Sequence, residues 1–149
     1  MKFLLSGLAL LAWLSSFAPA AETNPESAIS TVLLRAEKSW DGATYTAYPS
    51  GQPEMTLLKI KIPPHTTLPW HTHPMPNVAY VVSGTLEVEN ADGSQHRTIS
   101  AGEVLPEIVN GVHRGKTGDA AVELLVFYAG ADGQSTAIPA AAPVPEPAP

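Results

Sequence analysis

The segment VAYVVSGTLEVENADGSQHRTI, residues 78–99, decides the fold class. In its TLEVE portion, Leu86 and Val88 alternate with glutamates, which is the period of a strand with one face in the core and the other in water. Asp92-Gly93 predicts a two-residue hairpin turn that returns the chain through residues 95–99. The segment therefore predicts antiparallel β-structure.

Short apolar segments separated by turn residues continue on both sides of this hairpin. Upstream, TLLKIKI (56–62) alternates apolar residues with lysines and ends at Pro63-Pro64. Downstream, EVLPEIV (103–109) and AAVELLVFYA (120–129) are further strand candidates. Because no convincing helical period lies between these segments, we expect an all-β fold, either a sandwich or a barrel.

The first 20 residues have the layout of a cleaved secretory signal peptide. They contain an early Lys2, an apolar run over residues 3–14 and the small-residue sequence Ala18-Pro19-Ala20. The apolar run is shorter than the ~20 residues that a membrane span needs. The chain has no cysteine, so neither disulfides nor a thiol-linked lipid anchor can form. We therefore expect a periplasmic or secreted protein with no membrane anchor after signal cleavage.

Composition divides the rest of the chain into three parts. We predict an N-terminal extension over residues 21–54, a barrel over residues 55–130 and a disordered Pro/Ala-rich tail over residues 131–149. Within the extension, SAISTVLLRAEK (27–38) is compatible with a short helix or an irregular strand. At 149 residues, the chain has room for one domain with a single core.

The charge balance excludes polyanionic partners. Removing Lys2 with the signal peptide leaves 7 basic against 14 acidic side chains, a formal charge of −7. The basic residues are scattered, and no helical stretch alternates basic and apolar faces. Since nucleic acid and anionic membrane surfaces attract basic proteins, we expect neither as a partner.

Two histidines stand one residue apart in PWHTHPMPN (69–77). On an extended chain, side chains at i and i+2 point to the same face, so His71 and His73 can reach one metal ion. Prolines on both sides of the pair restrict its backbone. Such a pair alone is weak support for a metal site, because alternating histidines also occur on wet strand faces.

The spacing of these residues, together with a downstream segment, resembles the two sequence motifs of the cupin superfamily. The first motif reads Gly-x5-His-x-His-x3-4-Glu-x6-Gly, and the second reads Gly-x5-Pro-x-Gly-x2-His-x3-Asn. Every gap is kept over roughly residues 55–129, and five of the ten motif positions match. The ten positions are occupied in order by His65, His71, His73, Asn77, Gly84, Gly102, Ile108, Asn110, His113 and Thr117.

The resemblance implies a double-stranded β-helix in which His71, His73 and His113 point into the barrel and hold a divalent metal ion. Iron, nickel and zinc are the expected ions, because imidazole suits all three. Asn77 stands where the family commonly has a glutamate ligand, so it is a weaker additional ligand or a contact behind the ligands. A barrel that binds no metal, or whose histidines hydrogen-bond a ligand, stays open as the alternative.

Glu107 is the candidate replacement for the missing carboxylate. It is an acidic residue within the apolar stretch VLPEIV (104–109), six residues before His113. A charge in such a stretch must be paired, bound to a metal or turned to water. If it turns inward, Glu107 is a fourth ligand or a catalytic general acid or base with a raised pKa. If it turns outward, it is a solvated residue. The alternation of residues cannot decide between these two orientations, because both faces of this segment are apolar.

Two functions follow from the resemblance. The first is an exported mononuclear metal-binding cupin that acts on a small molecule as an oxygenase or isomerase, by O2 activation or by polarising a carbonyl or hydroxyl group. The second is a non-catalytic periplasmic module that binds or senses a metal or a small ligand. A purely structural barrel is a third alternative. The resemblance also implies a homodimer, and we expect His65 on the rim and His96 in solvent.

Overall fold

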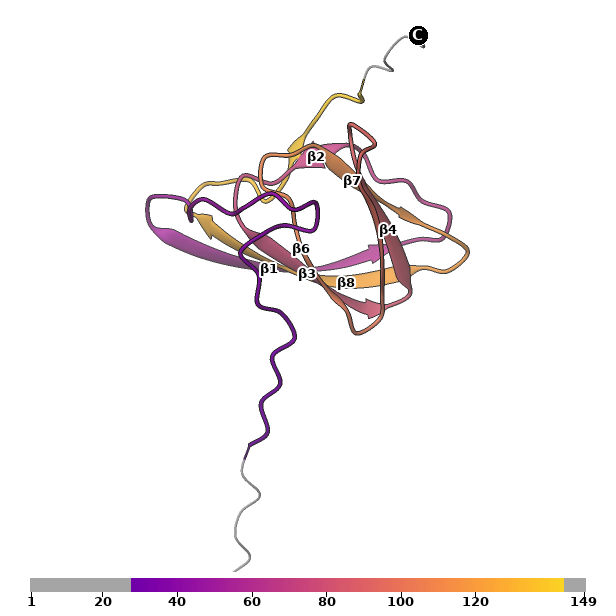
Figure 1. Ribbon diagram of the computed structural model, residues 1–149, viewed down its shortest axis with the longest axis horizontal. Coiled ribbons are helices and arrows are strands. Elements are labelled where there is room, and N and C mark those ends of the chain that lie inside the picture. The colour runs from indigo at the N-terminus through magenta and orange to yellow at the C-terminus, as the bar shows by residue number, and fades with distance from the viewer. Residues whose placement is uncertain (1–27, 144–149) are drawn as a thin grey trace, which may run out of the picture. The chain divides into compact units, whose positions relative to one another are not determined.

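The computed structural model describes residues 28–143, so the predicted signal peptide and residues 144–149 lie outside the described part (Figure 1). All of the strands belong to the compact unit that begins at Val32. The described residues contain no helix. A helix with the length and hydropathy that a membrane span requires is therefore absent from this part of the chain. The described chain is all-β, which confirms the predicted fold class.

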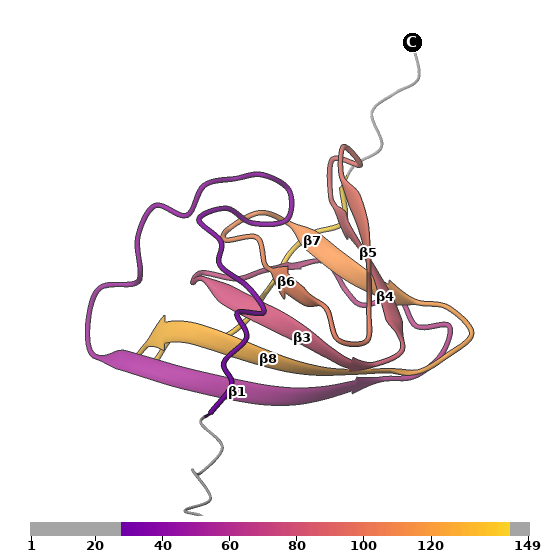
Figure 2. The same cartoon turned by 60° about the horizontal axis from the view of Figure 1, so that its bottom comes forward.

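The described strands form two antiparallel sheets. The first sheet has the order β1-β8-β3-β6, and the second has the order β5-β4-β7-β2-β9. Figure 2 shows β1, β8 and β3 side by side in the first sheet. The strand bounds are β1 Pro53–Ile62, β2 His71–Thr72, β3 Asn77–Ser83, β4 Thr85–Asn90, β5 His96–Ser100, β6 Val104–Pro106, β7 His113–Thr117, β8 Val122–Ala131 and β9 Ile138–Pro139.

Alternation along the strands places the predicted apolar residues inside the barrel. In β4, Leu86 and Val88 are buried while Glu87 is exposed. In β1, the two lysines extend outward to pair with Glu123 of β8. The core consists of Ile62, Met75, Ala79, Val81, Leu86, Val88, Ile99, Leu105, Val122, Leu124, Val126 and Tyr128. Two antiparallel sheets around this core make the double-stranded β-helix that the resemblance implies.

The hairpin between β4 and β5 is longer than predicted. Its loop covers residues 91–95, so the prediction of a two-residue turn is wrong. Two side chains stabilise the longer loop: Asn90 Oδ1 accepts a hydrogen bond from the Gln95 N–H at 3.0 Å, and Asp92 Oδ1 accepts one from the Ser94 N–H at 2.8 Å. Such side-chain acceptors compete with the tight turn that the dipeptide alone favours.

Residues 28–36 of the N-terminal extension form neither the short helix nor the irregular strand that the sequence allows for residues 27–38. Its first pairing is an isolated bridge between Lys38 and Thr44. The Trp40 N–H then donates a hydrogen bond to the Pro106 carbonyl at 2.9 Å. The extension therefore lies against the end of β6.

Part of the segment that is predicted as a disordered tail, residues 131–149, forms a strand. Ile138–Pro139 forms β9, which pairs with β2. Proline is tolerated there because β9 lies at the edge of its sheet, where one row of backbone groups needs no partner. The barrel therefore extends beyond the predicted boundary at residue 130.

Gly84 joins β3 to β4 in a left-handed conformation with a φ of 82°. A Cβ atom there would overlap the backbone oxygen of Ala121. Gly93, in the loop between β4 and β5, also has a positive φ of 72°, but a Cβ at that position would meet open space. The two glycines thus share backbone conformation and differ in their surroundings.

We predict that Gly84→Ala lowers the free energy of unfolding by roughly 2–5 kcal/mol, because left-handed strain and a backbone clash act together. Gly93→Ala is the matched control and should cost about 1 kcal/mol, since it adds strain alone. Urea denaturation followed by tryptophan fluorescence measures both changes. Equal losses in the two variants would contradict the steric account.

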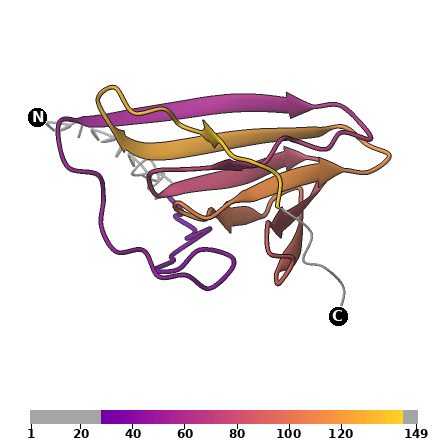
Figure 3. The same ribbon diagram turned by 90° about the horizontal axis from the view of Figure 1, so that it is seen from above.

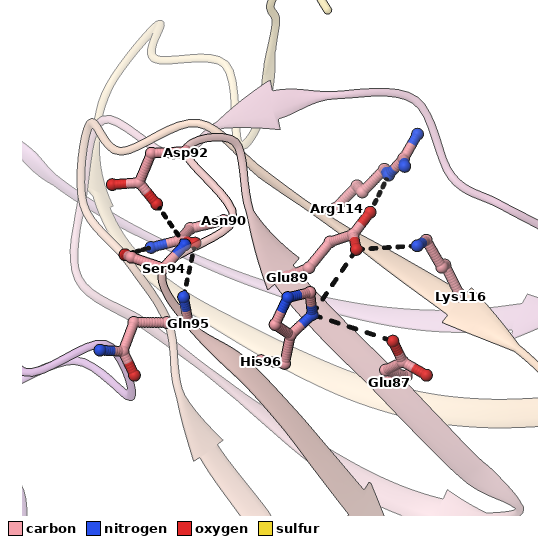
Figure 4. Close-up of polar contacts among 9 residues, drawn as sticks. All are labelled: Glu87, Glu89, Asn90, Asp92, Ser94, Gln95, His96, Arg114 and Lys116. Carbon is pink, nitrogen blue, oxygen red and sulfur yellow. Dashed lines mark hydrogen bonds and ion pairs between the residues drawn. The ribbon is translucent and has the colours of Figure 1, made fainter. Parts of the chain in front are cut away.

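A cluster of charged side chains covers the outer face of β4, β5 and β7 (Figure 4). The Glu89 carboxylate accepts a hydrogen bond from Arg114 Nε at 2.6 Å and lies 2.8 Å from Lys116 Nζ. His96 Nδ1 lies 3.6 Å from this carboxylate and 4.0 Å from that of Glu87. Burial raises the pKa of Glu89, but the hydrogen bonds and charges of its lysine and arginine partners outweigh burial and hold that pKa below its usual value.

We predict that Glu89→Gln lowers the free energy of unfolding at neutral pH by roughly 1–2 kcal/mol, because Arg114 and Lys116 lose their counter-charge. A carboxyl group with a depressed folded-state pKa stabilises the fold above its unfolded pKa of ~4.3 and loses this contribution as pH falls through the folded value. The difference in free energy of unfolding between wild type and variant should therefore shrink as the pH falls from about 6 to about 3.

Chemical denaturation across this pH range measures the gap. Glu87→Gln is the matched control, because its carboxylate lies on the same face of β4 but is more exposed and 4.0 Å from His96. A gap for Glu89→Gln that did not change with pH would be incompatible with the ion-pair explanation.

Candidate metal centre

Three histidines converge inside the barrel from neighbouring segments. His71 lies in β2 and pairs in register with His113 at the start of β7, and His73 follows β2 and bridges to Val109. The ring centroids are 4.6, 4.9 and 5.0 Å apart, and one nitrogen from each ring lies within 4.8 Å of the others. The structure thus brings together the three predicted ligands in a cluster that could hold one ion.

Backbone carbonyls fix the tautomer of all three rings. The Nδ1 atoms of His71, His73 and His113 lie 3.0, 2.7 and 2.9 Å from the carbonyl oxygens of Pro69, Thr136 and Gly111, respectively. A carbonyl oxygen only accepts hydrogen bonds, so each Nδ1 must carry the proton. Each neutral ring then presents an unprotonated Nε2, which is a form that binds metal.

Burial keeps two of the rings neutral. It lowers the pKa of His71, although the hydrogen bond to Pro69 acts in the opposite direction. It also lowers the pKa of His73 to about 4, although the nearby Glu107 charge opposes this shift. Both rings are therefore neutral at neutral pH and need lose no proton to bind an ion.

Glu107 turns into the barrel rather than toward water. It follows β6, which ends at Pro106 and is shorter than predicted, and the residue is 8% exposed. Its Oε2 lies 3.4 Å from the Nε2 of His113. Burial lowers the pKa of His113, but the Glu107 carboxylate outweighs burial and raises this pKa above its ordinary value. Of the two orientations compatible with the sequence, the structure has the inward one.

Two polar atoms at the centre of this cluster make no hydrogen bond. Within residues 28–143, Glu107 Oε2 and His113 Nε2 are both buried, and neither makes a hydrogen bond. A buried polar atom without a partner is costly, so such atoms mark a place for a bound species. Three imidazole nitrogens and a nearby carboxylate are donors that iron, nickel and zinc accept. The residues present therefore fit a divalent ion of this group.

The cavity beside the histidines is small. It has a volume of about 60 Å³. Its polar lining includes the three histidines, Glu107 and Tyr128, and its apolar lining consists of Ile60, Leu68, Leu86, Val88, Leu124 and Val126. Because drug-sized ligands occupy pockets of about 300–1,000 Å³, this cavity suits an ion and a ligand of few non-hydrogen atoms.

Asn77 and Glu107 lie across from each other. β3 and β6 pair Val78 with Pro106, and the Glu107 N–H then donates a hydrogen bond to the Asn77 carbonyl at 3.0 Å. The Asn77 side chain is buried, with Nδ2 donating to the Met75 carbonyl at 3.2 Å and Oδ1 without a partner. Glu107 lines the histidine cavity and Asn77 does not. A carboxylate is therefore available from the neighbouring segment rather than from position 77.

The four glycine positions of the two motifs all have left-handed backbone. Gly84 and Gly102 have φ values of 82° and 90°. His65 and Asn110, which replace glycine in the motifs, have φ values of 52° and 60° and are the non-glycine residues with positive φ in the described chain. Asparagine and histidine enter this region more readily than most residues. The backbone therefore keeps its left-handed conformation at the two motif positions where another residue replaces glycine.

The other two histidines of the chain lie away from this centre. His65 is exposed on the rim, beside an outer groove of about 610 Å³ that lies outside the barrel and apart from the three ligands. His96 is exposed and forms a second group of candidate ligand atoms with Glu87 and Glu89. The Glu89 carboxylate is already neutralised by two cationic side chains, which would repel a metal ion (Figure 4). Both histidines lie where the sequence predicts.

Two further partners of the site carry no signal in the sequence. The Thr136 carbonyl holds His73, and the Tyr45 hydroxyl donates a hydrogen bond to the Glu107 carbonyl at 2.7 Å. Burial and then the Glu107 charge raise the pKa of Tyr45 to about 12, so this hydroxyl keeps its proton. The two partners lie in the predicted tail and the predicted N-terminal extension, where composition alone does not point to the histidines.

Known proteins share this architecture. Residues 58–128 match the family model of the cupin domain. The chain is similar to the crystal structure of the DMSP lyase DddQ from Ruegeria pomeroyi at 18% identity and a TM-score of 0.51, over 65% of this chain and 46% of the lyase chain. It is also similar to a cupin-like protein from Thermotoga maritima at 17% identity and a TM-score of 0.50, over 59% of this chain and 65% of that one.

The chain spans less than half the length of the lyase, and no curated protein matches it significantly. At these identities, likeness to a solved structure shows the fold alone. The family-model match, however, covers all three histidines of the cluster, and the two antiparallel sheets have the corresponding fold. Residues 58–128 therefore form a domain of the cupin superfamily.

Proposed function

We propose that this chain is an exported cupin that binds one divalent metal ion through His71, His73 and His113 and acts on a small molecule. The proposal rests on the three hydrogen bonds from Nδ1 to backbone carbonyls, which place the proton of each neutral ring on Nδ1 and leave Nε2 as its donor atom beside one cavity. Iron, nickel and zinc are the candidate ions. When bound, the ion supplies Lewis-acid or redox chemistry.

The chain's own residues supply proton transfer and hydrogen bonding. Glu107 lines the cavity with a carboxylate oxygen that has no hydrogen-bond partner, so it can accept a proton from a bound small molecule or complete the ligand set. Tyr128 also lines the cavity, and burial and then the Glu107 charge raise its pKa to about 12, so its hydroxyl keeps its proton. These groups support an oxygenase or isomerase reaction on a compact substrate.

A non-catalytic module that binds or senses a metal or small ligand is the second candidate. Two observations favour it: the cavity of about 60 Å³ leaves little room for a substrate, and Glu107 Oε2 lies 3.4 Å from His113 Nε2, against a candidate ligand. A carboxylate held there is placed to balance the charge of an ion. The two candidates share the metal centre and differ in whether Glu107 reaches a substrate.

Export and self-association stay predictions. The signal peptide that would direct the chain to the periplasm or outside the cell lies outside the described residues. The homodimer implied by the resemblance is supported by large apolar side chains exposed on the outer face of the first sheet, among them Met55, Leu57 and Phe127. Size-exclusion chromatography with light scattering measures this association directly.

We predict that the chain without its signal peptide binds one Zn²⁺, and that His71→Ala, His73→Ala and His113→Ala each weaken binding by at least about 100-fold, because each removes one of three imidazole donors. Isothermal titration calorimetry and elemental analysis measure affinity and stoichiometry. His65→Ala and His96→Ala are controls that should bind as the wild type does. A chain that held no stoichiometric metal, and bound none on titration with iron, nickel or zinc, would overturn the proposal.

We predict that Glu107→Gln weakens Zn²⁺ binding by about tenfold or more, because it removes the negative charge that lies beside the three imidazole donors. Glu54→Gln, on the exposed start of β1, is the matched control and should leave affinity unchanged. Calorimetric titration compares the two variants under the same buffer conditions. Unchanged affinity in Glu107→Gln would remove its role as a ligand and leave proton transfer as its function.

A further inference from the structure

The chain turns back after β8 and crosses to the edge of the second sheet. This segment, residues 132–140, is called the C-terminal strap below. Figure 3 shows it in yellow, reversing after β8 and running back along the barrel. It begins at a fixed point, because the Asp132 N–H donates a hydrogen bond to the Gln52 carbonyl and the Ala131 N–H donates one to Gln134 Oε1, at 2.9 and 3.0 Å.

The strap holds the strand that carries His71. β2 has two residues, and its register contact with β7 is the pair of His71 with His113. On its other side, β9 pairs Pro139 with His71 and Ile138 with Thr72. A two-residue strand is too short to hold its position through one neighbour alone, so β9 supports β2 on the side opposite β7.

The strap also holds His73 directly. The His73 Nδ1 lies 2.7 Å from the Thr136 carbonyl, which is 63 residues away in sequence. The other two rings use carbonyls two residues before them, at Pro69 and Gly111. Local turns therefore orient His71 and His113, whereas the orientation and tautomer of His73 depend on a distant segment.

We propose that the C-terminal strap is a positioning element of the metal centre, which fixes the Nδ1–H tautomer of His73 and clamps β2. This inference rests on the proposed metal-binding function. Its residues are not ligands: they act through His73 and His71. Without the strap, the His73 ring can rotate and exchange tautomers, so that Nε2 no longer faces the ion in the binding form.

Two variants with matched controls test this role. Deletion of residues 135–149 removes the Thr136 carbonyl and β9 but keeps Gln134 and its turn, and deletion of residues 144–149 is its control. Ala140→Pro is the milder variant, because it removes the N–H that donates to the Trp70 carbonyl at 2.9 Å. Ala141→Pro is its control, one residue beyond that hydrogen bond.

We expect the deletion of residues 135–149 to weaken Zn²⁺ binding by about 10–100-fold, the range for loss of a partner that orients a ligand. Ala140→Pro should weaken it in the same direction, and both controls should bind as the wild type does. Circular dichroism establishes that each variant retains its β-structure. If the chain without residues 135–149 does not fold, the comparison of Ala140→Pro with Ala141→Pro tests the inference.

Nitrogen-15 NMR of the metal-free protein supplies a second readout that lost stability alone would not move. In the wild type, the His73 ring should show a protonated Nδ1 and a bare Nε2, and the strap variants should show tautomer exchange at His73 but not at His71 or His113. Unchanged Zn²⁺ affinity and an unchanged His73 tautomer in folded strap variants would overturn the inference. If the wild-type chain binds no metal but the strap variants still show tautomer exchange at His73, the proposed function is overturned and the positioning of His73 stands.

Discussion

Everything at the centre of this barrel depends on imidazole N–H groups held by backbone carbonyls. A backbone carbonyl cannot rotate away as a side-chain acceptor can, so each hydrogen bond fixes both the ring plane and the protonated nitrogen. Burial adds to this by lowering the pKa of His71 and His73, which keeps these rings uncharged. Hydrogen bonding and burial together leave the Nε2 atoms of these two rings unprotonated.

The double-stranded β-helix brings these rings together through strand register. Pairing of His71 with His113 across β2 and β7 places two rings side by side, and the alternation of His71 and His73 adds the third. The same logic places Glu107 across from Asn77, although the two belong to different motifs. A charge missing from one segment can therefore be supplied by its neighbour, since both lie at the same level of the barrel.

Much of the fold was predictable because alternation of apolar and polar residues reports directly on which side of a strand faces the core. Leu86 and Val88 follow that rule, and the motif spacing identified the three histidines that cluster. The orientation of Glu107 was not predictable, since apolar residues surround it on both sides. The longer hairpin loop depends on side-chain hydrogen bonds from Asn90 and Asp92, and β9 depends on an open sheet edge, so neither follows from local composition.

The distance along the chain between His73 and its carbonyl partner also sets an order of events during synthesis. Two of the rings can find their backbone partners as soon as their own turns exist, but His73 must wait for a residue that emerges 63 positions later. An incomplete chain that has made both motifs therefore lacks one oriented donor. On the proposed function, the metal centre is complete only after the segment that follows β8 has paired with β2 and reached His73.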